Sequence, residues 1–345
     1  MKKNFIILVL IIIAAAVLCL GMPIAHRKLS YGIYSPEKLS RDKRYIDFDV
    51  KAAGSISDDF VKSNTAVIVR SVGERTENAC LELLGDIFGK ENVILVKNIT
   101  PLKSAAAVCY EIALKKNKKW TLIVDSDILV IKERLLNFLK YAELLSQKYD
   151  DVYCVNGLMI SKFREQPYNT GINLFYTKHL EKASEYLKDA DFLKTELFVK
   201  VKMFQENYMD YRMLYIIGLA DFFQYYRDIV RKSLIFCCKW DNLDRKKSFW
   251  EKNSRFNRDF KYALEGCRIK DETETLFCSS KSGVDSMAVN KYLDELIQEK
   301  KLNLPEQKPL KLNEALNAVN YFKLPDADIV KVDTIGDTIK FMELL

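Results

Sequence analysis

The sequence predicts an α/β protein with a mostly parallel sheet flanked by helices, an N-terminal transmembrane helix and a mainly helical C-terminal extension. An apolar run opens the chain, short buried strands alternate with amphipathic helices over residues 61–240, and helical patterns dominate beyond about residue 180. With 49% hydrophobic and 29% charged residues, the 345-residue chain is neither disordered nor of low complexity. A net charge of +7 is mild and predicts no nucleic-acid partner, but it suits a membrane surface or phosphate-bearing ligands.

The apolar run Phe5–Met22 contains no charged residue and follows two lysines. At ~1.5 Å per residue, a helix of this length spans about 27 Å, close to the thickness of a bilayer's hydrocarbon core. A cleaved signal peptide is the alternative, although its apolar region is normally shorter and the residues after Leu20 make a poor cleavage site. We therefore predict an uncleaved anchor over residues 1–25 and a juxtamembrane linker over residues 26–60.

Positive charge is distributed unevenly around this segment. Six Lys and Arg residues lie between residues 27 and 44, against two before the segment. The positive-inside rule then predicts a single-pass membrane protein whose large C-terminal part lies in the cytoplasm. In a eukaryotic cell the same layout would be typical of an enzyme of the Golgi lumen, with Asn98 as a glycosylation acceptor.

Residues 61–240 show the pattern of repeated βαβ units. Apolar runs predict strands at 65–69, 92–96, 120–124 and 151–155, and two further β-like runs at 157–161 and 172–176. Apolar residues at helical spacing separate the first four strands, and Ser104 is the expected N-cap of the second of these helices. Such alternation favours right-handed crossovers and a parallel sheet. Residues 241–345 are predicted to form a helical accessory region.

The eight cysteines suggest no metal site. No Cys-x-x-Cys or Cys/His ligand spacing is present, so a structural zinc site is not expected. Four cysteines lie in apolar runs and are predicted to be buried: Cys80, Cys109, Cys154 and Cys278. The adjacent pair Cys237 and Cys238 is interpreted as two buried free thiols.

Asp125 and Asp127 are the strongest candidates for chemistry. They directly follow the apolar strand at 120–124, and ligands of open α/β sheets bind beyond the carboxyl ends of the strands. Two carboxylates at this spacing can approach one hard cation, or one cation and one ribose, and Mg²⁺ and Mn²⁺ prefer such oxygen ligands. Asp-x-Asp recurs elsewhere in the chain, but only here within the βαβ array. The alternative is a pair of solvated acids that end a strand.

The turn after the first strand, Arg-Ser-Val-Gly-Glu-Arg, suits a phosphate-bearing ligand. Gly73 permits close approach of the backbone, and the N–H groups of the helix that follows favour anions. Arg70 and Arg75 can contact a phosphate in a bidentate manner or stack on a base. The alternative is an ordinary turn with exposed arginines. G-x-G-x-x-G, P-loop and G-x-S-x-G motifs are absent from the sequence, which weighs against nicotinamide enzymes, P-loop NTPases and α/β-hydrolases.

Together the first turn and the Trp-Thr-Leu-Ile-Val-Asp-Ser-Asp segment resemble a GT-A-type glycosyltransferase, similar to the family-two group, over residues 62–235. The resemblance implies a GT-A-like Rossmann-type fold, a nucleotide-diphosphate sugar as donor, and a glycan or lipid-linked acceptor. It implies nucleotide-sugar contacts from Arg70, Ser71, Gly73, Glu74, Arg75, Asp125, Gly171 and Asn173. It also implies that Asp125 and Asp127 hold Mn²⁺ or Mg²⁺.

A catalytic base is less clearly marked. Inverting members of such families usually supply an acidic side chain that deprotonates the acceptor hydroxyl. Asp221 and Glu196 are the two candidates, and a helix N-cap is the alternative role for Asp221. Retaining members often use a C-terminal His as a metal ligand, but His179 is better explained by a cap or surface role. Inversion is therefore favoured.

Two other functions stay open at this stage. A haloacid-dehalogenase-like phosphatase could use Asp125 and Asp127, although Leu129 stands where such enzymes normally have Thr or Val. A membrane-anchored α/β scaffold without catalysis is the other. The runs 222–232 and 246–258 interleave aromatic and basic residues. They form either helical core with a solvated face or a surface for anionic headgroups or a lipid-phosphate acceptor.

Overall fold

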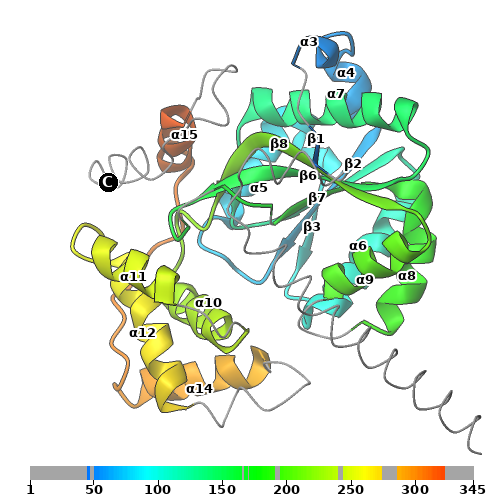
Figure 1. Ribbon diagram of the computed structural model, residues 1–345. Helices are drawn as coiled ribbons and strands as arrows, with labels where there is room; N and C mark the ends of the chain where they lie inside the picture. The colour runs from blue at the N-terminus through cyan, green and yellow to red at the C-terminus, as the bar shows by residue number, and fades with distance from the viewer. Residues whose placement is uncertain are drawn as a thin grey trace, which may run out of the picture. The chain divides into compact units, whose positions relative to one another are not determined.

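The computed structural model describes residues 45–46, 50–164, 167–169, 171–190, 195–239, 244–273 and 286–322 (Figure 1). The chain divides into two compact units, Met1–Tyr45 and Ile46–Leu345. The predicted anchor at 1–25 lies outside the described residues, as does most of the predicted linker. None of the helices in the described ranges is both long enough and apolar enough to span a bilayer.

Strands and helices alternate through the first two thirds of the second unit. The strands are β1 (Tyr45–Ile46), β2 (Thr65–Ser71), β3 (Val93–Lys97), β4 (Trp120–Asp125), β5 (Ile128–Val130), β6 (Val152–Ser161), β7 (Ile172–Tyr176) and β8 (Met209–Ala220). The helices around them are α3 (Val50–Ala53), α4 (Asp58–Ser63), α5 (Glu77–Phe88), α6 (Leu102–Lys116), α7 (Lys132–Lys148), α8 (Leu180–Lys188) and α9 (Thr195–Gln205). The later helices are α10 (Tyr226–Lys239), α11 (Asp244–Asn253), α12 (Asp259–Glu272), α14 (Ser286–Gln298) and α15 (Leu312–Tyr321).

The sheet has the strand order β8-β6-β7-β4-β2-β3, and β5 pairs with β8. β2 runs parallel to β3 and β4, and β6 runs parallel to β8. β7 is antiparallel to both β4 and β6, so β6 and β8 point the same way as β4. The predicted mostly parallel sheet is thus confirmed. The carboxyl ends of β2, β4, β6 and β8 meet at one side of the sheet, which we call the carboxyl edge.

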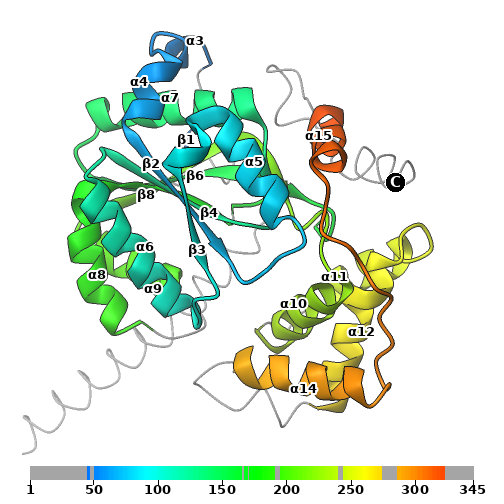
Figure 2. The same cartoon turned by 180° about the vertical axis from the view of Figure 1, so that it is seen from behind.

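Helices cover both faces of the sheet (Figures 1 and 2). Residues of α5, α7 and α15 pack into one core cluster with one face of the sheet, and residues of α6, α8 and α9 pack into a second cluster with the other. Because both faces are covered, the inner strands are apolar without alternation, and every residue of β2 is buried. This two-sided core fixes the positions of the loops at the carboxyl edge.

Most predicted elements are present, and two details are corrected. The predicted fourth strand at 151–155 and the β-like run at 157–161 form the single strand β6. Ser104 lies inside α6, whose N-cap position is taken by Pro101. The prediction of mainly helical structure beyond residue 180 missed β8, because an apolar run such as Leu214–Leu219 does not by itself distinguish a buried strand from a buried helix.

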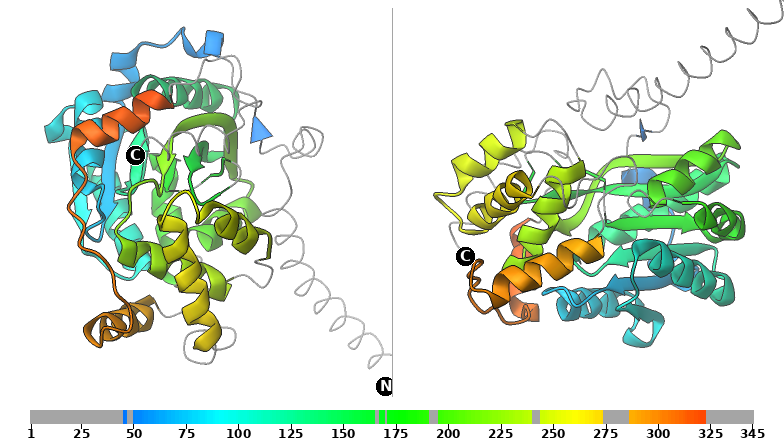
Figure 3. Two further views of the ribbon diagram at one scale, coloured as in Figure 1. Left: turned by 90° about the vertical axis from the view of Figure 1, so that its left-hand side faces the viewer. Right: turned by 90° about the horizontal axis from the view of Figure 1, so that it is seen from below.

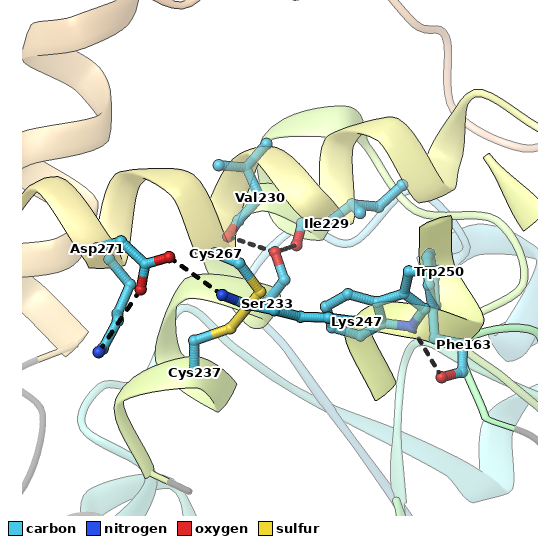
Figure 4. Close-up of a disulfide and its surroundings, with 10 residues drawn as sticks. Phe163, Ile229, Val230, Ser233, Cys237, Lys247, Trp250, Cys267 and Asp271 are labelled. Atoms are coloured by element: carbon cyan, nitrogen blue, oxygen red, sulfur yellow. Dashed lines mark hydrogen bonds and ion pairs between the residues drawn. A yellow bond between two sulfur atoms is a disulfide. The ribbon is translucent and has the colours of Figure 1, made fainter. Parts of the chain in front are cut away.

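Helices α10, α11, α12 and α14 form a group of their own beyond the carboxyl edge (Figures 1 and 3). Two small apolar clusters hold them together, one built around Val230 and Leu293 and one around Trp250 and Phe260. A disulfide joins Cys237 of α10 to Cys267 of α12 (Figure 4). The interpretation of Cys237 as a free thiol is therefore wrong.

Candidate functional site

The loop after β2 is tied to the loop after β4 by Glu74. One oxygen of this carboxylate accepts hydrogen bonds from the Ser71 hydroxyl at 2.8 Å, the backbone N–H of Val72 at 2.8 Å and the Ser126 hydroxyl at 2.6 Å. Gly73 has a φ of 91°, a left-handed conformation that favours glycine, and its surroundings are open. Three of the residues that the resemblance assigns to the nucleotide, Ser71, Gly73 and Glu74, thus lie in or beside this loop.

Arg70 links the carboxyl ends of β2 and β4 to helix α9. Its guanidinium donates to one oxygen of Asp125 at 2.9 and 2.7 Å and to Glu196 at 2.5 Å. The arginine side chain is only 6% exposed, so it acts as a buried counter-ion for two carboxylates. Although burial opposes the change, Arg70 and Lys200 lower the pKa of Glu196. Glu196 is therefore already engaged by Arg70, beside Asp125.

Asp127 and Asp221 share one lysine. Lys232, which projects from α10, contacts an oxygen of Asp127 and an oxygen of Asp221, the latter at 2.8 Å. Gln224 donates to Asp221 at 2.9 Å, and the Tyr168 hydroxyl donates to its second oxygen at 3.0 Å. Against the effect of burial, Lys232 lowers the pKa of Asp221 to about 2.

Asp221 stands at the carboxyl end of β8 in a strained conformation. Its φ is 62°, in the left-handed region that non-glycine residues seldom adopt. Such conformations persist where the surrounding structure holds them and often occur at functional sites. The helix N-cap alternative does not describe this position, because α10 begins only at Tyr226.

The residues around Asp125 and Asp127 fit a divalent cation. Within the described part of the chain, one oxygen of each carboxylate, Oδ2 of Asp125 and Oδ1 of Asp127, has no hydrogen-bond donor. Burial raises the pKa of Asp125 to about 7 despite Arg70, and burial also raises that of Asp127 despite Lys232. The site is therefore short of positive charge, and a cation would favour both ionised carboxylates.

In the described ranges, no group of three or more His, Cys, Asp or Glu side chains is placed so that it could hold one metal ion. That finding is compatible with a cation held at Asp125 and Asp127, because Mg²⁺ commonly binds through one or two carboxylates and takes its other ligands from substrate phosphates and water.

Gly171 and Asn173 lie at the start of β7, beside the same edge. The Gly171 carbonyl accepts a hydrogen bond from the Asp125 N–H at 2.7 Å, and a Cβ at Gly171 would lie 2.6 Å from Ile128. Asn173 donates to Glu196 at 3.4 Å and accepts from Lys200 at 2.9 Å. Both residues are therefore close to the Asp125 carboxylate and its partners.

Arg75 is directed away from this cluster. Its Nε donates to the backbone carbonyl of Lys308, and its own carbonyl accepts from Leu310, both in the segment before α15. Here Arg75 fastens the C-terminal segment to the first loop. The other predicted site residues converge on the carboxyl edge.

The sequence pattern missed Lys232, Tyr168 and Gln224 as site residues. Lys232 appeared only as one base in an aromatic and basic run, and its helical spacing gave no sign that it would lie beside two carboxylates. The one available signal was its place in the first helix after Asp221, because a helix that follows a strand end begins at the ligand-binding edge.

A cavity of ≈ 110 Å³ opens beside this cluster. Its walls come from the carboxyl ends of β6 and β8 and from α10, α11 and α12. Asp221 and Lys232 line the cavity, whereas Asp125 and Asp127 are not among its lining residues. Asp221 is therefore the predicted base that faces this cavity.

Comparison with known proteins gives no family assignment. No family model matches the chain, and no curated protein matches it. One similar solved structure is a glycosyltransferase involved in the glycosylation of the major capsid of PBCV-1, at 17% identity over 43% of this chain and 80% of that chain, with a TM-score of 0.29.

Two further similar structures are described as transferases. The mannose-1-phosphate geranyltransferase from Thermus thermophilus is 14% identical over 49% of this chain and 78% of that chain, with a TM-score of 0.30. A cytidylyltransferase from Leptospira borgpetersenii is 11% identical over 63% of this chain and 98% of that chain, with a TM-score of 0.32. At such TM-scores these similarities establish neither a shared fold nor a shared activity.

Proposed function

We propose that this protein is a glycosyltransferase that moves a sugar from a nucleotide-diphosphate sugar to a glycan or lipid-linked acceptor. The observation that carries the proposal is the convergence at the carboxyl edge of an arginine-bearing loop after β2, the Asp125-Ser-Asp127 loop after β4, and Asp221 after β8. Cations, carboxylates and an adjacent cavity then meet where open α/β sheets bind their ligands.

Asp125 and Asp127 would hold Mn²⁺ or Mg²⁺, which supplies positive charge to the diphosphate as it leaves. Lys232 lies beside Asp127 and can contribute a second positive charge in the same place. Preorganised charge of this kind acts where negative charge develops in the transition state. Arg70 keeps the Asp125 carboxylate in one orientation.

Asp221 is the base in this proposal, and the transfer inverts the anomeric centre. The acceptor oxygen bonds to the anomeric carbon, the bond from that carbon to the diphosphate oxygen breaks, and the hydroxyl proton passes to Asp221. Asp221 is preferred over Glu196 because Asp221 is among the residues that line the cavity and Glu196 is not. Residues 1–25 would anchor the enzyme in a membrane, with the catalytic domain in the cytoplasm or, in a eukaryote, in the Golgi lumen.

The test is turnover of nucleotide-diphosphate sugars by the full-length protein with Mn²⁺ or Mg²⁺. We expect Asp127→Asn to reduce turnover by about a hundredfold or more, because it removes a carboxylate from the cation site. Asp189→Asn, an exposed carboxylate at the end of α8, is the matched control and should leave turnover unchanged. Hydrolysis of phosphate monoesters instead of nucleotide sugars would favour the phosphatase.

A further inference from the structure

The cavity beside Asp221 carries more positive charge than its carboxylate can balance. Arg164, Lys232 and Lys246 line it, and Asp221 is its one acidic lining residue among those the structure describes. Lys232 is already shared between Asp221 and Asp127. Arg164 and Lys246 are therefore surplus cations.

Lys246 contacts rings instead of carboxylates. Its Nζ lies 3.4 Å from the centre of the Phe236 ring and 5.0 Å from that of Trp250, and no described residue pairs with it as a counter-ion. Burial lowers the pKa of Lys246 well below its usual range, and the nearby Arg164 lowers it further. The neutral amine is therefore favoured while no anion is bound, and a bound anion would favour the charged ammonium instead.

Arg164 also lines the cavity, although it is more exposed to solvent than Lys246. Its guanidinium lies 3.7 Å from the centre of the Tyr168 ring, and Tyr168 in turn donates its hydroxyl hydrogen to Asp221. An arginine placed in this way keeps N–H donors for an anion. The two surplus cations thus stand near the proposed base.

The walls of the cavity are fixed by contacts between distant segments. Lys162 and Asp259 form an ion pair in which their side chains are only 5% and 14% exposed. The Trp250 indole N–H donates to the Phe163 carbonyl at 3.1 Å (Figure 4). These two contacts attach the segment after β6 to α11 and α12, so the cations are held around a preformed space.

The size of the cavity limits what it can hold. A volume of ≈ 110 Å³ accommodates roughly seven to eleven water-sized groups. A phosphate group and a few adjoining carbon and oxygen atoms fit such a volume. The rings of Phe236 and Trp250 offer flat apolar surface for those adjoining atoms.

We propose that this cavity binds the phosphate group of the acceptor, a phosphate ester with a free hydroxyl a few atoms from the phosphorus, through Lys246 and Arg164. The proposal rests on the proposed function, because it assigns the cavity to the acceptor. Binding in this way brings the acceptor hydroxyl to Asp221. A soluble polyol phosphate and a phospholipid headgroup share this chemistry.

Calorimetric titration of the full-length protein in detergent tests the proposal with glycerol 3-phosphate and with a short-chain phosphatidylglycerol. We expect Lys246→Met to weaken binding by about tenfold to a hundredfold, the usual effect of losing a charge-assisted hydrogen bond. Lys247→Met is the matched control, because this neighbour on α11 pairs with Asp271 outside the cavity (Figure 4). Binding of glycerol 3-phosphate supports a soluble acceptor, and binding of the lipid alone supports a headgroup.

Two results would overturn the assignment. Equal affinity in Lys246→Met and the unaltered protein would show that the cavity does not hold the phosphate. A nucleoside diphosphate that binds more weakly to Lys246→Met would assign the cavity to the donor instead. A different result would contradict the proposed function itself: nucleotide binding that does not respond to Asp127→Asn.

Discussion

The two sides of the carboxyl edge treat charge in opposite ways. On the nucleotide side, Arg70 is enclosed by Asp125 and Glu196, and the loop carboxylate Glu74 accepts three hydrogen bonds. On the cavity side, Lys246 and Arg164 face rings, and the described residues provide neither with an ion pair. The first side is organised before any ligand arrives, whereas the second is completed only by an anion.

This difference gives a way to distinguish charges that stabilise the fold from charges that would bind a ligand. A paired buried charge contributes to stability, because removing one partner leaves the other uncompensated. An unpaired charge reduces stability and is retained for another reason. Substitutions that conserve side-chain size can therefore distinguish the two sides.

The largest effect is expected for Arg70→Met. This substitution leaves Asp125 and Glu196 without their counter-ion and should lower the free energy of unfolding by about 3 kcal/mol. Chemical denaturation of the full-length protein measures it. Arg75→Met is the control, because among the described residues the Arg75 side chain bonds to a backbone carbonyl and pairs with no carboxylate, and it should change stability by about 0.5 kcal/mol or less. Equal losses in both variants would contradict the distinction.

The opposite sign is expected for Lys246→Met. Methionine keeps a long unbranched side chain against Phe236 and Trp250 while the unbalanced charge disappears. The free energy of unfolding should stay the same or rise by about 1 kcal/mol. The same denaturation experiment reports the change, and a loss of more than about 1 kcal/mol would show that Lys246 has a structural role.

A smaller effect is expected at His179, away from the edge. Its Nε2 is buried and has no hydrogen-bond partner among the described residues, and its ring packs on Tyr208. Burial, followed by the charges of Lys178 and Lys182, lowers its pKa to about 4. An unfolded histidine has a pKa of about 6.5. The unfolded chain therefore binds protons more tightly, so stability is lost as pH falls from about 6.5 towards 4.

Partial exposure of His179 reduces this loss to the order of 1 kcal/mol. The free energy of unfolding, measured between pH 7 and pH 5, should fall further for the unaltered protein than for His179→Gln. Parallel pH profiles would contradict the prediction. Unlike Lys246, His179 should show no response to phosphate esters, which separates an unpaired group in the core from one in a cavity.

Most strands of the sheet were predictable from sequence, but β8 and the direction of β7 were not. Continuous apolar runs at 65–69 and 120–124 mark strands buried on both faces, and their order along the chain implies parallel pairing. β8 escaped prediction because its apolar residues carry no period that separates strand from helix. The direction of β7 likewise depends on pairing across the sheet.

The candidate site was predictable where it follows strand ends and not where it depends on side chains from distant segments. Asp125, Asp127 and Arg70 follow from their place after β4 and at the end of β2. The lysine between Asp127 and Asp221 comes from α10, over a hundred residues after Asp127 in sequence, and no local pattern encodes that contact. Arg75 was predicted to contact the nucleotide because of its residue type and its place in the first turn, but its side chain bonds to the C-terminal segment instead.

The most direct measurement is the affinity of the full-length protein for nucleoside diphosphates, titrated with and without Mn²⁺. We predict binding that Mn²⁺ strengthens, that Asp127→Asn weakens by at least tenfold, and that Lys246→Met leaves unchanged. Binding of the same strength in Asp127→Asn, with or without the cation, would contradict a diphosphate site at the carboxyl edge.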